Sequence, residues 1–102
     1  MPRKIIEFYF GRECPYCVNI IPAVKRLVAE DEVEIKKCEV WHNTENSQRM
    51  GSLRELYGEY CGGNFTVPSF YDPETKRLVC NPGSYENLKK WVFAEEVKGR
   101  DL

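Results

Sequence analysis

The feature that most constrains the fold is a change of hydrophobic periodicity near the start of the chain. Residues 5–10 form an almost continuous apolar and aromatic run, which predicts a strand covered on both faces. Apolar residues then recur at helical spacing over residues 15–31, and residues 33–41 predict a second strand. Because a strand–helix–strand unit connects parallel strands with a right-handed crossover, the first half of the chain predicts an α/β fold.

The middle of the chain predicts one helix followed by a hairpin. Asn43 and Thr44 are helix-starting residues, and apolar residues with a period of 3–4 continue to Tyr60. Two short strands follow at residues 67–71 and 76–80, and turn-forming residues between them predict an antiparallel hairpin.

A last helix is predicted after Gly83 and Ser84, which gives the element order βαβαββα. This order predicts one mixed four-stranded sheet flanked by helices. A chain of 102 residues fits a single domain over residues 1–102, in which residues 98–102 are expected to form a frayed tail.

Two cysteines, Cys14 and Cys17, stand two residues apart where the first strand gives way to the first helix. The first N–H groups of a helix have no internal partner and carry the positive end of its dipole, so a thiolate at Cys14 should be stabilised. Pro15 fits the first helical position. We therefore expect Cys14 to be an exposed nucleophile of lowered pKa, and Cys17 to be a shielded thiol that resolves its mixed disulfide.

Three further cysteines, Cys38, Cys61 and Cys80, are scattered along the chain. An odd cysteine number does not describe a disulfide-stapled scaffold, so we interpret these three as buried packing residues. A zinc site is disfavoured, because zinc usually takes four ligands and neither these cysteines nor the single His42 is paired at ligand spacing. We expect His42 to be solvated.

The sequence Cys14-Pro15-Tyr16-Cys17 resembles the dithiol active site of glutaredoxins, and Thr66-Val67-Pro68 resembles the segment that leads into their third strand. The resemblance extends from residue 5 to about residue 97. It implies a thioredoxin fold and a thiol–disulfide oxidoreductase, with a cis proline at Pro68 lying against the cysteine pair. It also implies that the backbone of Val67 binds the substrate.

The same resemblance suggests further binding residues, and the sequence departs from the glutaredoxin pattern at two places. Arg12 stands near the basic residue that usually precedes the first cysteine, and Gly83 and Ser84 stand where glutaredoxins carry Gly-Gly and an acidic residue that bind glutathione. Pro22 instead resembles the proline in the active-site helix of thioredoxins. Glutathione and a thioredoxin reductase therefore both stay open as electron donors, and no bound cofactor is expected.

Several other residues have two interpretations. Glu7 is either a buried carboxylate that takes the Cys17 proton or, as we favour, a strand residue that reaches solvent. Tyr16 is expected to be exposed and to contact substrate. The remaining large aromatics are expected to pack in the core, namely Trp41, Trp91, Tyr57 and Tyr60. The acidic residues 30–32 are expected to form a solvated loop.

Charge and hydropathy limit the partners. The chain has 15 basic and 16 acidic residues, so no basic field favours nucleic acid. It has no long apolar stretch and no signal-peptide pattern, so we expect a cytoplasmic monomer away from membranes.

The sequence thus predicts an enzyme of electron transport that reduces protein disulfides or glutathione mixed disulfides. Its partners would be disulfide-bearing proteins, with glutathione or a thioredoxin reductase as donor. A less favoured alternative is a module in which Cys14 of two chains and two further thiols bind an iron–sulfur cluster.

Overall fold

The computed structural model describes residues 4–31 and 33–94, and the predicted tail at residues 98–102 lies outside them. The first half contains strand β1 (Lys4–Phe10), helix α1 (Pro15–Asp31) and strand β2 (Val33–Glu39). Helices α2 (Thr44–Gly51) and α3 (Arg54–Tyr60) follow. The second half ends with β3 (Ser69–Asp72), β4 (Arg77–Cys80) and α4 (Tyr85–Phe93). The predicted bounds of α1 are confirmed, and the four strands agree with the expected ones to within about two residues.

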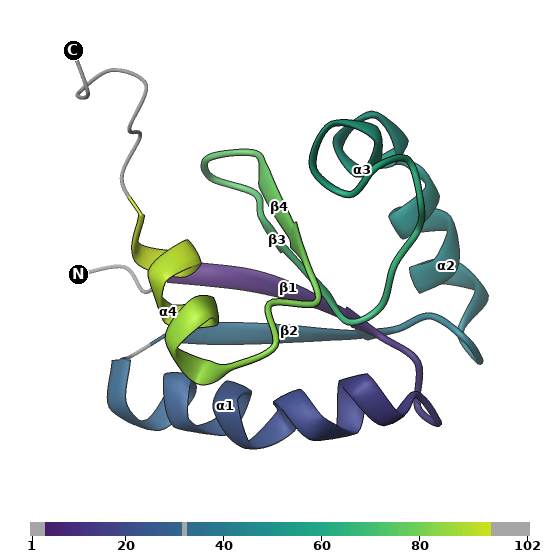
Figure 1. Cartoon of the computed structure of the whole chain (residues 1–102). Coiled ribbons are helices and arrows are strands. Elements are labelled where there is room, and N and C mark those ends of the chain that lie inside the picture. The colour runs from purple at the N-terminus through teal and green to yellow at the C-terminus, as the bar shows by residue number, and fades with distance from the viewer. Residues whose placement is uncertain (1–3, 32, 95–102) are drawn as a thin grey trace, which may run out of the picture.

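The four strands form one mixed sheet in the order β2-β1-β3-β4 (Figure 1). Strand β1 pairs in parallel with β2 and antiparallel with β3, and β4 pairs antiparallel with β3. The predicted parallel start and antiparallel hairpin are therefore confirmed. The arrangement is an α/β architecture with four helices among the described residues and is compatible with a thioredoxin-like fold.

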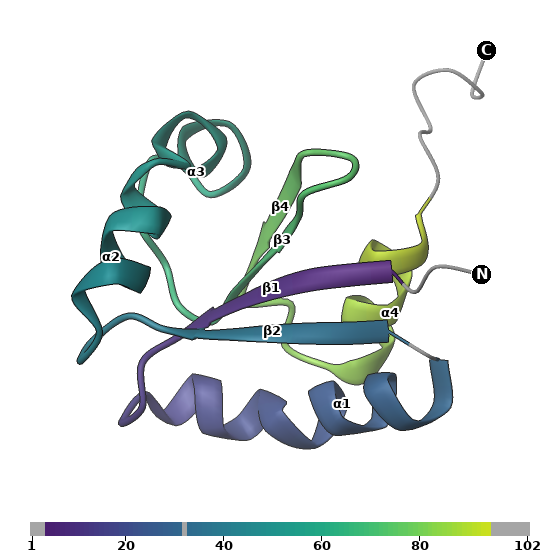
Figure 2. The same ribbon diagram turned by 180° about the vertical axis from the view of Figure 1, so that it is seen from behind.

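Helices α1 and α4 pack on one face of the sheet and α2 and α3 on the other (Figures 1 and 2), and each face carries its own apolar cluster. Side chains alternate along β1, so Ile6 and Phe8 face α1 and α4, whereas Tyr9 faces α2 and α3. Helix α1 contributes residues at helical spacing to the first cluster, namely Ile20, Val24 and Leu27. Both faces of β1 are thus covered, as its continuous apolar run predicts.

The single helix predicted from residue 43 to Tyr60 is wrong, because the segment forms two helices. Helix α2 begins at an N-cap, where the Asn43 side chain accepts a hydrogen bond from the Asn46 N–H at 2.9 Å. It ends at Gly51 and Ser52, and the Ser52 hydroxyl donates to the Arg49 carbonyl at 2.6 Å. Leu53 is buried against the sheet at this break, so the apolar period continues across it and hides it in the sequence.

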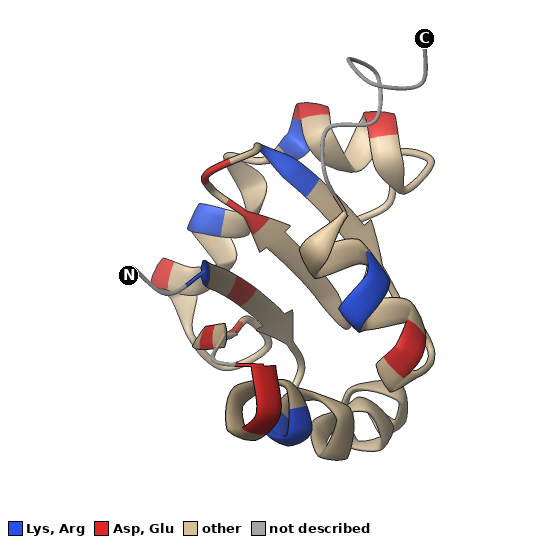
Figure 3. Ribbon diagram, turned by 90° about the vertical axis from the view of Figure 1, so that its left-hand side faces the viewer, with Lys and Arg blue, Asp and Glu red and all other residues tan. Residues whose placement is uncertain are grey.

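The surface carries charges of both signs, which are mixed over the helices and strands visible in Figure 3. None of the helices within residues 4–31 and 33–94 is long and apolar enough to cross a membrane.

Candidate functional site

Cys14 lies immediately before α1, at the same end of the sheet as the connection from β2 to α2 (Figure 1). Its carbonyl accepts the first intrahelical hydrogen bond, from the Val18 N–H at 3.0 Å, and its own N–H donates to the Gly11 carbonyl at 3.0 Å. Pro15 occupies the first helical position, where a missing N–H breaks no bond. The predicted place of the cysteine pair, at the strand-to-helix junction, is confirmed.

Both thiols of the pair are free and lie largely beneath the surface. Cys14 is 5 % exposed and Cys17 is 1 % exposed, so the prediction of a well-exposed Cys14 is wrong, although the order of the two holds. Burial is the main cause that raises the pKa of Cys17 to about 12, and the hydrogen bond and charge of the neighbouring Cys14 thiol contribute to this rise. The Gly11 N–H acts in the opposite direction, because it bonds to the Cys17 sulfur and favours its thiolate.

The segment before β3 closes over the cysteine pair. The Val67–Pro68 peptide bond is cis, as the resemblance implies, and the Cys14 thiol lies 4.0 Å from the Val67 carbonyl oxygen. The Pro68 carbonyl accepts a hydrogen bond from the Asn81 N–H at 2.7 Å. Val67 and Pro68 are therefore brought to the cysteines, and the end of β4 is brought to Pro68.

The residues expected to bind glutathione form the start of α4. Gly83 has a φ of 86°, in the left-handed region that favours glycine, and Ser84 is the N-cap. The Ser84 hydroxyl accepts a hydrogen bond from the Asn87 N–H at 3.1 Å. This hydroxyl therefore caps the helix, and the carboxylate in the first turn of α4 belongs to Glu86.

Glu39 organises the loop beside the cysteines, and the sequence did not single it out. Its carboxylate accepts hydrogen bonds from the backbone N–H groups of Arg12, Trp41 and His42, at 2.9, 3.1 and 2.8 Å. Desolvation acts to raise the pKa of Glu39, but these three donors outweigh it and hold the pKa below its ordinary value. No pattern in the sequence marks Glu39, because its donors come from two loops that only the fold brings together.

Glu13, the neighbour of Cys14, is paired with His42. The Nε2 atom of His42 lies 2.7 and 2.9 Å from the two carboxylate oxygens of Glu13, and this contact is the main reason that the pKa of Glu13 is lowered. His42 is exposed, as expected, but it is not simply solvated. The imidazole ring thus lies against the carboxylate that stands next to Cys14 in the sequence.

Glu7 is buried, so the interpretation that it reaches solvent is wrong. Its carboxylate accepts a hydrogen bond from the Tyr9 hydroxyl and pairs with Arg49 of α2 at 2.8 Å. Because Glu7 shares the face of β1 with Tyr9, it points toward α2 and α3 rather than toward α1, which carries Cys17. The other interpretation, a base for Cys17, therefore has no support from the geometry.

The exposed aromatic side chains differ in part from those expected. Tyr16 is 63 % exposed, as predicted, and Arg12 is also exposed at the start of α1. Tyr57 is buried, and Trp91 packs against the first cluster. Core packing is wrong for Tyr60 and for Trp41, which are 42 % and 51 % exposed. The Trp41 ring lies against Gly11, where a Cβ atom would come within 2.3 Å of it.

Two of the three scattered cysteines form a disulfide, so their interpretation as free packing residues is wrong. Cys61 and Cys80 are bonded across 19 positions of the sequence, with their Cα atoms 6.0 Å apart. Cys38 is free and buried in the second cluster, as predicted, and burial is the main cause that raises the pKa of its thiol. Such a pairing depends on the fold and not on spacing.

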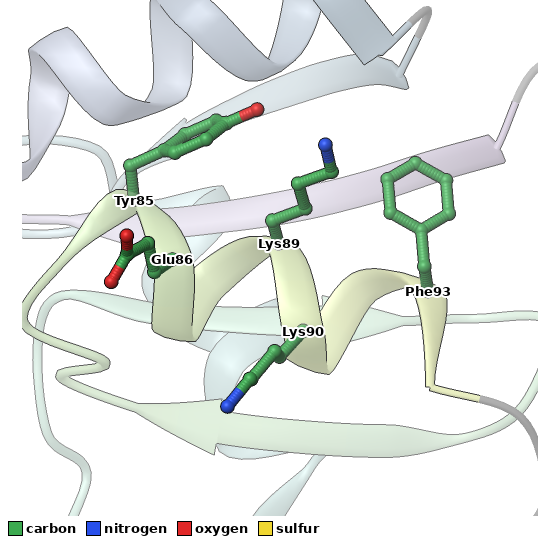
Figure 4. Close-up of a pocket in the computed structure, with 5 residues that line it drawn as sticks. All are labelled: Tyr85, Glu86, Lys89, Lys90 and Phe93. Atoms are coloured by element: carbon green, nitrogen blue, oxygen red, sulfur yellow. The ribbon is translucent and has the colours of Figure 1, made fainter.

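A hollow on α4 lies away from the cysteines. It is lined by Tyr85, Glu86, Lys89, Lys90 and Phe93, and Tyr85 and Lys89 project to the same side of the helix (Figure 4). The Tyr85 hydroxyl donates to the Asp31 carboxylate at 2.6 Å, and Lys89 pairs with it at 3.2 Å. Asp31 ends α1, roughly 25 Å from its start for a helix of this length, and is partnered rather than in a solvated loop. Residue 32 lies outside the described residues.

Comparisons of this chain with protein-family models, with curated proteins and with solved structures find no match. Within residues 4–31 and 33–94, no group of three or more His, Cys, Asp or Glu side chains is arranged to hold a metal ion.

Proposed function

We propose that this chain is a thiol–disulfide oxidoreductase, a glutaredoxin-like member of the thioredoxin-fold superfamily that works through Cys14 and Cys17. The observation that carries the proposal is the contact of the two thiols at the start of α1, with Cys17 deeper and held by the Gly11 N–H. The cis Val67–Pro68 segment adds support, since the Val67 carbonyl oxygen lies 4.0 Å from the Cys14 thiol and places backbone beside the proposed nucleophile.

The cycle begins when the Cys14 thiolate attacks one sulfur of a substrate disulfide. The substrate S–S bond breaks, a mixed disulfide forms, and the departing sulfur leaves as a thiolate that takes a proton from water. Cys17 then attacks the Cys14 sulfur and releases the second substrate thiolate. Two electrons pass from the dithiol to the substrate, and two protons end on the substrate sulfurs.

The neighbours of Cys17 explain why it acts second. While Cys14 is a thiol or thiolate, its hydrogen bond and charge help to keep Cys17 protonated. Both of these causes are lost when the Cys14 sulfur enters a mixed disulfide, whereas the Gly11 N–H bond, which favours the thiolate, is retained. The pKa of Cys17 therefore falls at the step at which its thiolate is required.

The electron donor is part of the proposal. Glutathione would be recognised near Gly83 and Ser84, but the Ser84 hydroxyl caps α4 and no acidic side chain stands at that position. The second candidate function is a thioredoxin-like cycle that does not use glutathione. The capping role of Ser84 and the presence of Pro22 inside α1 favour it. A cytoplasmic location also remains a proposal.

The test is reduction of a protein disulfide, run in parallel with glutathione plus glutathione reductase and with thioredoxin reductase. We expect turnover in at least one system, loss of at least about 100-fold in Cys14→Ser because the nucleophile is gone, and most turnover retained in Cys38→Ala. A wild-type rate no higher than that of Cys14→Ser in both systems would contradict the proposal. The system that supports turnover identifies the donor.

A further inference from the structure

The Cys61–Cys80 disulfide joins the end of α3 to the end of β4, and the proposed cycle does not use it. Both cysteines are only partly buried, in contrast to the three free cysteines, which are all buried. A partly exposed disulfide can be attacked by a thiolate from solution, whereas a fully enclosed one cannot. The pair is therefore placed where thiol–disulfide exchange can reach it.

This disulfide closes the part of the chain that contacts the candidate site. Cys80 is paired with Ser69 in the β3–β4 ladder, and the next residue, Asn81, holds the Pro68 carbonyl through its N–H. Residues 61–80 include Val67, whose carbonyl lies 4.0 Å from the Cys14 thiol. The bond thus joins both ends of a segment that places backbone against the active cysteine.

The stretch between the disulfide and Val67 has few other bonds. Gly62 and Gly63 follow Cys61 with φ angles of 69° and 91°, and no atom lies within 4 Å of a Cβ placed on either. The Gly63 N–H donates a hydrogen bond to the Tyr57 carbonyl at 2.9 Å. The Phe65 ring packs against the Tyr57 ring, with 5.1 Å between the ring centroids. Glycines in open space offer little resistance to movement, so the disulfide is the main covalent restraint on this side of the segment.

We propose that Cys61–Cys80 is a second redox site, opened by dithiol reductants, whose state sets the position of the Val67 carbonyl and hence the reactivity of Cys14. A reductant thiolate attacks one of the two sulfurs, the Cys61–Cys80 bond breaks, and the second reductant thiol resolves the mixed disulfide. The products are two cysteine thiols and the oxidised reductant, with two electrons and two protons transferred. The inference extends the proposed function, because it makes the same site depend on redox state.

The first test measures whether the bond opens in the folded protein. The Cys17→Ala/Cys38→Ala variant, in which Cys14 is the only free thiol, is equilibrated with dithiothreitol buffers without denaturant and alkylated, and each cysteine peptide is quantified by mass spectrometry. We expect Cys61 and Cys80 to become alkylated together while circular dichroism still reports a folded chain. Alkylation of the pair only after unfolding would show a purely structural bond and overturn the proposal.

The second test measures the coupling to Cys14. The alkylation rate of Cys14 is compared between the oxidised and reduced states of that variant, and in a matched variant that also carries Cys61→Ser and Cys80→Ser. We expect the reduced protein and the serine variant to differ from the oxidised protein in the same direction by about fivefold or more, the low end of coupling between two sites. Re-oxidation should restore the original rate, which excludes unfolding as the cause.

An equal Cys14 rate in the oxidised and reduced states would overturn the coupling. The readout is independent of disulfide reductase turnover, so a chain without such activity still gives a result. Failure of the proposed function and failure of the second redox site are therefore distinguished.

Discussion

At the scale of single residues, Gly11 and Cys14 act on Cys17 in opposite senses. The Gly11 N–H favours the Cys17 thiolate, whereas burial and the Cys14 thiol favour the protonated form and raise the pKa to about 12. The pair is thus asymmetric even though both side chains are largely buried. This asymmetry gives a prediction that does not depend on finding a substrate.

We predict that the two thiols differ in alkylation rate at pH 7 when each is studied without the other. Cys17 in the Cys14→Ser variant should react at least about tenfold more slowly than Cys14 in the Cys17→Ser variant, because a tenfold lower thiolate fraction corresponds to a pKa difference of one unit. The raised pKa of Cys17 means that its rate should keep rising above pH 9, with a midpoint above that of free cysteine. Burial, the largest cause, persists when Cys14 is removed. Rates measured with iodoacetamide across pH check this, and a Cys17 plateau below pH 8 would contradict it.

Some single residues could be assigned from the sequence and others could not, for physical reasons. Cys14 and Ser84 depend on local rules for helix starts, so their positions before α1 and α4 follow from the residues beside them. Glu7 is buried only because Arg49, 42 residues away, supplies a charge that pairs with it. The disulfide partner of Cys61 likewise depends on the fold.

At the scale of elements, the strand-to-helix loop of residues 11–14 is fixed by packing and by Glu39. The Trp41 ring covers Gly11 so closely that a Cβ atom at this position would require the ring to shift. The prediction of a single helix at residues 43–60 was wrong because packing on the sheet continues across the break between α2 and α3. Met50 of α2 and Leu53, the N-cap of α3, both pack in the second cluster, and the sequence period does not show the turn between the two helices.

We predict that Gly11→Ala destabilises the protein by about 1–3 kcal/mol, the usual cost of overpacking, because its Cβ would lie 2.3 Å from the Trp41 ring. Urea unfolding measures the cost, and Trp41 fluorescence in a Trp91→Phe background reports displacement of the ring. Gly51→Ala is the matched control, since no atom lies within 4 Å of its Cβ and the helix should gain up to about 1 kcal/mol. In a Trp41→Ala background, Gly11→Ala should lose most of its cost.

Equal stability of Gly11→Ala and the wild type, with unchanged Trp41 fluorescence, would show that the loop is not packed as described.

At the scale of the whole molecule, the chain combines one mixed sheet with two apolar clusters and one disulfide among the described residues. The mixed four-stranded sheet followed from sequence periodicity, because it predicted a parallel start and an antiparallel hairpin, whereas the strand order β2-β1-β3-β4 comes from the structure. Disulfides are uncommon in reducing compartments, so Cys61–Cys80 stands against the expected cytoplasmic location unless the bond is exchanged there.

We predict that replacing Cys61 and Cys80 together by Ala lowers the free energy of unfolding by about 3 kcal/mol, as expected for a closed loop of this length. The constraint acts mainly on the unfolded chain, so the folded spectrum should be retained. Urea unfolding under oxidising conditions gives the value, and wild-type protein unfolded in the presence of a reductant should match the variant. A loss well under about 1 kcal/mol would mean that the bond does not constrain the unfolded chain.

The proposed cycle requires that Cys14 attacks first and that Cys17 resolves, and capture of the covalent intermediate tests this order. Each variant is exposed to a disulfide substrate under non-reducing conditions and analysed by mass spectrometry. We expect that Cys17→Ser retains substrate, or glutathione if it is accepted, bound to Cys14, and that Cys14→Ser forms no adduct. An adduct on Cys17 in Cys14→Ser, with none on Cys14 in Cys17→Ser, would contradict it.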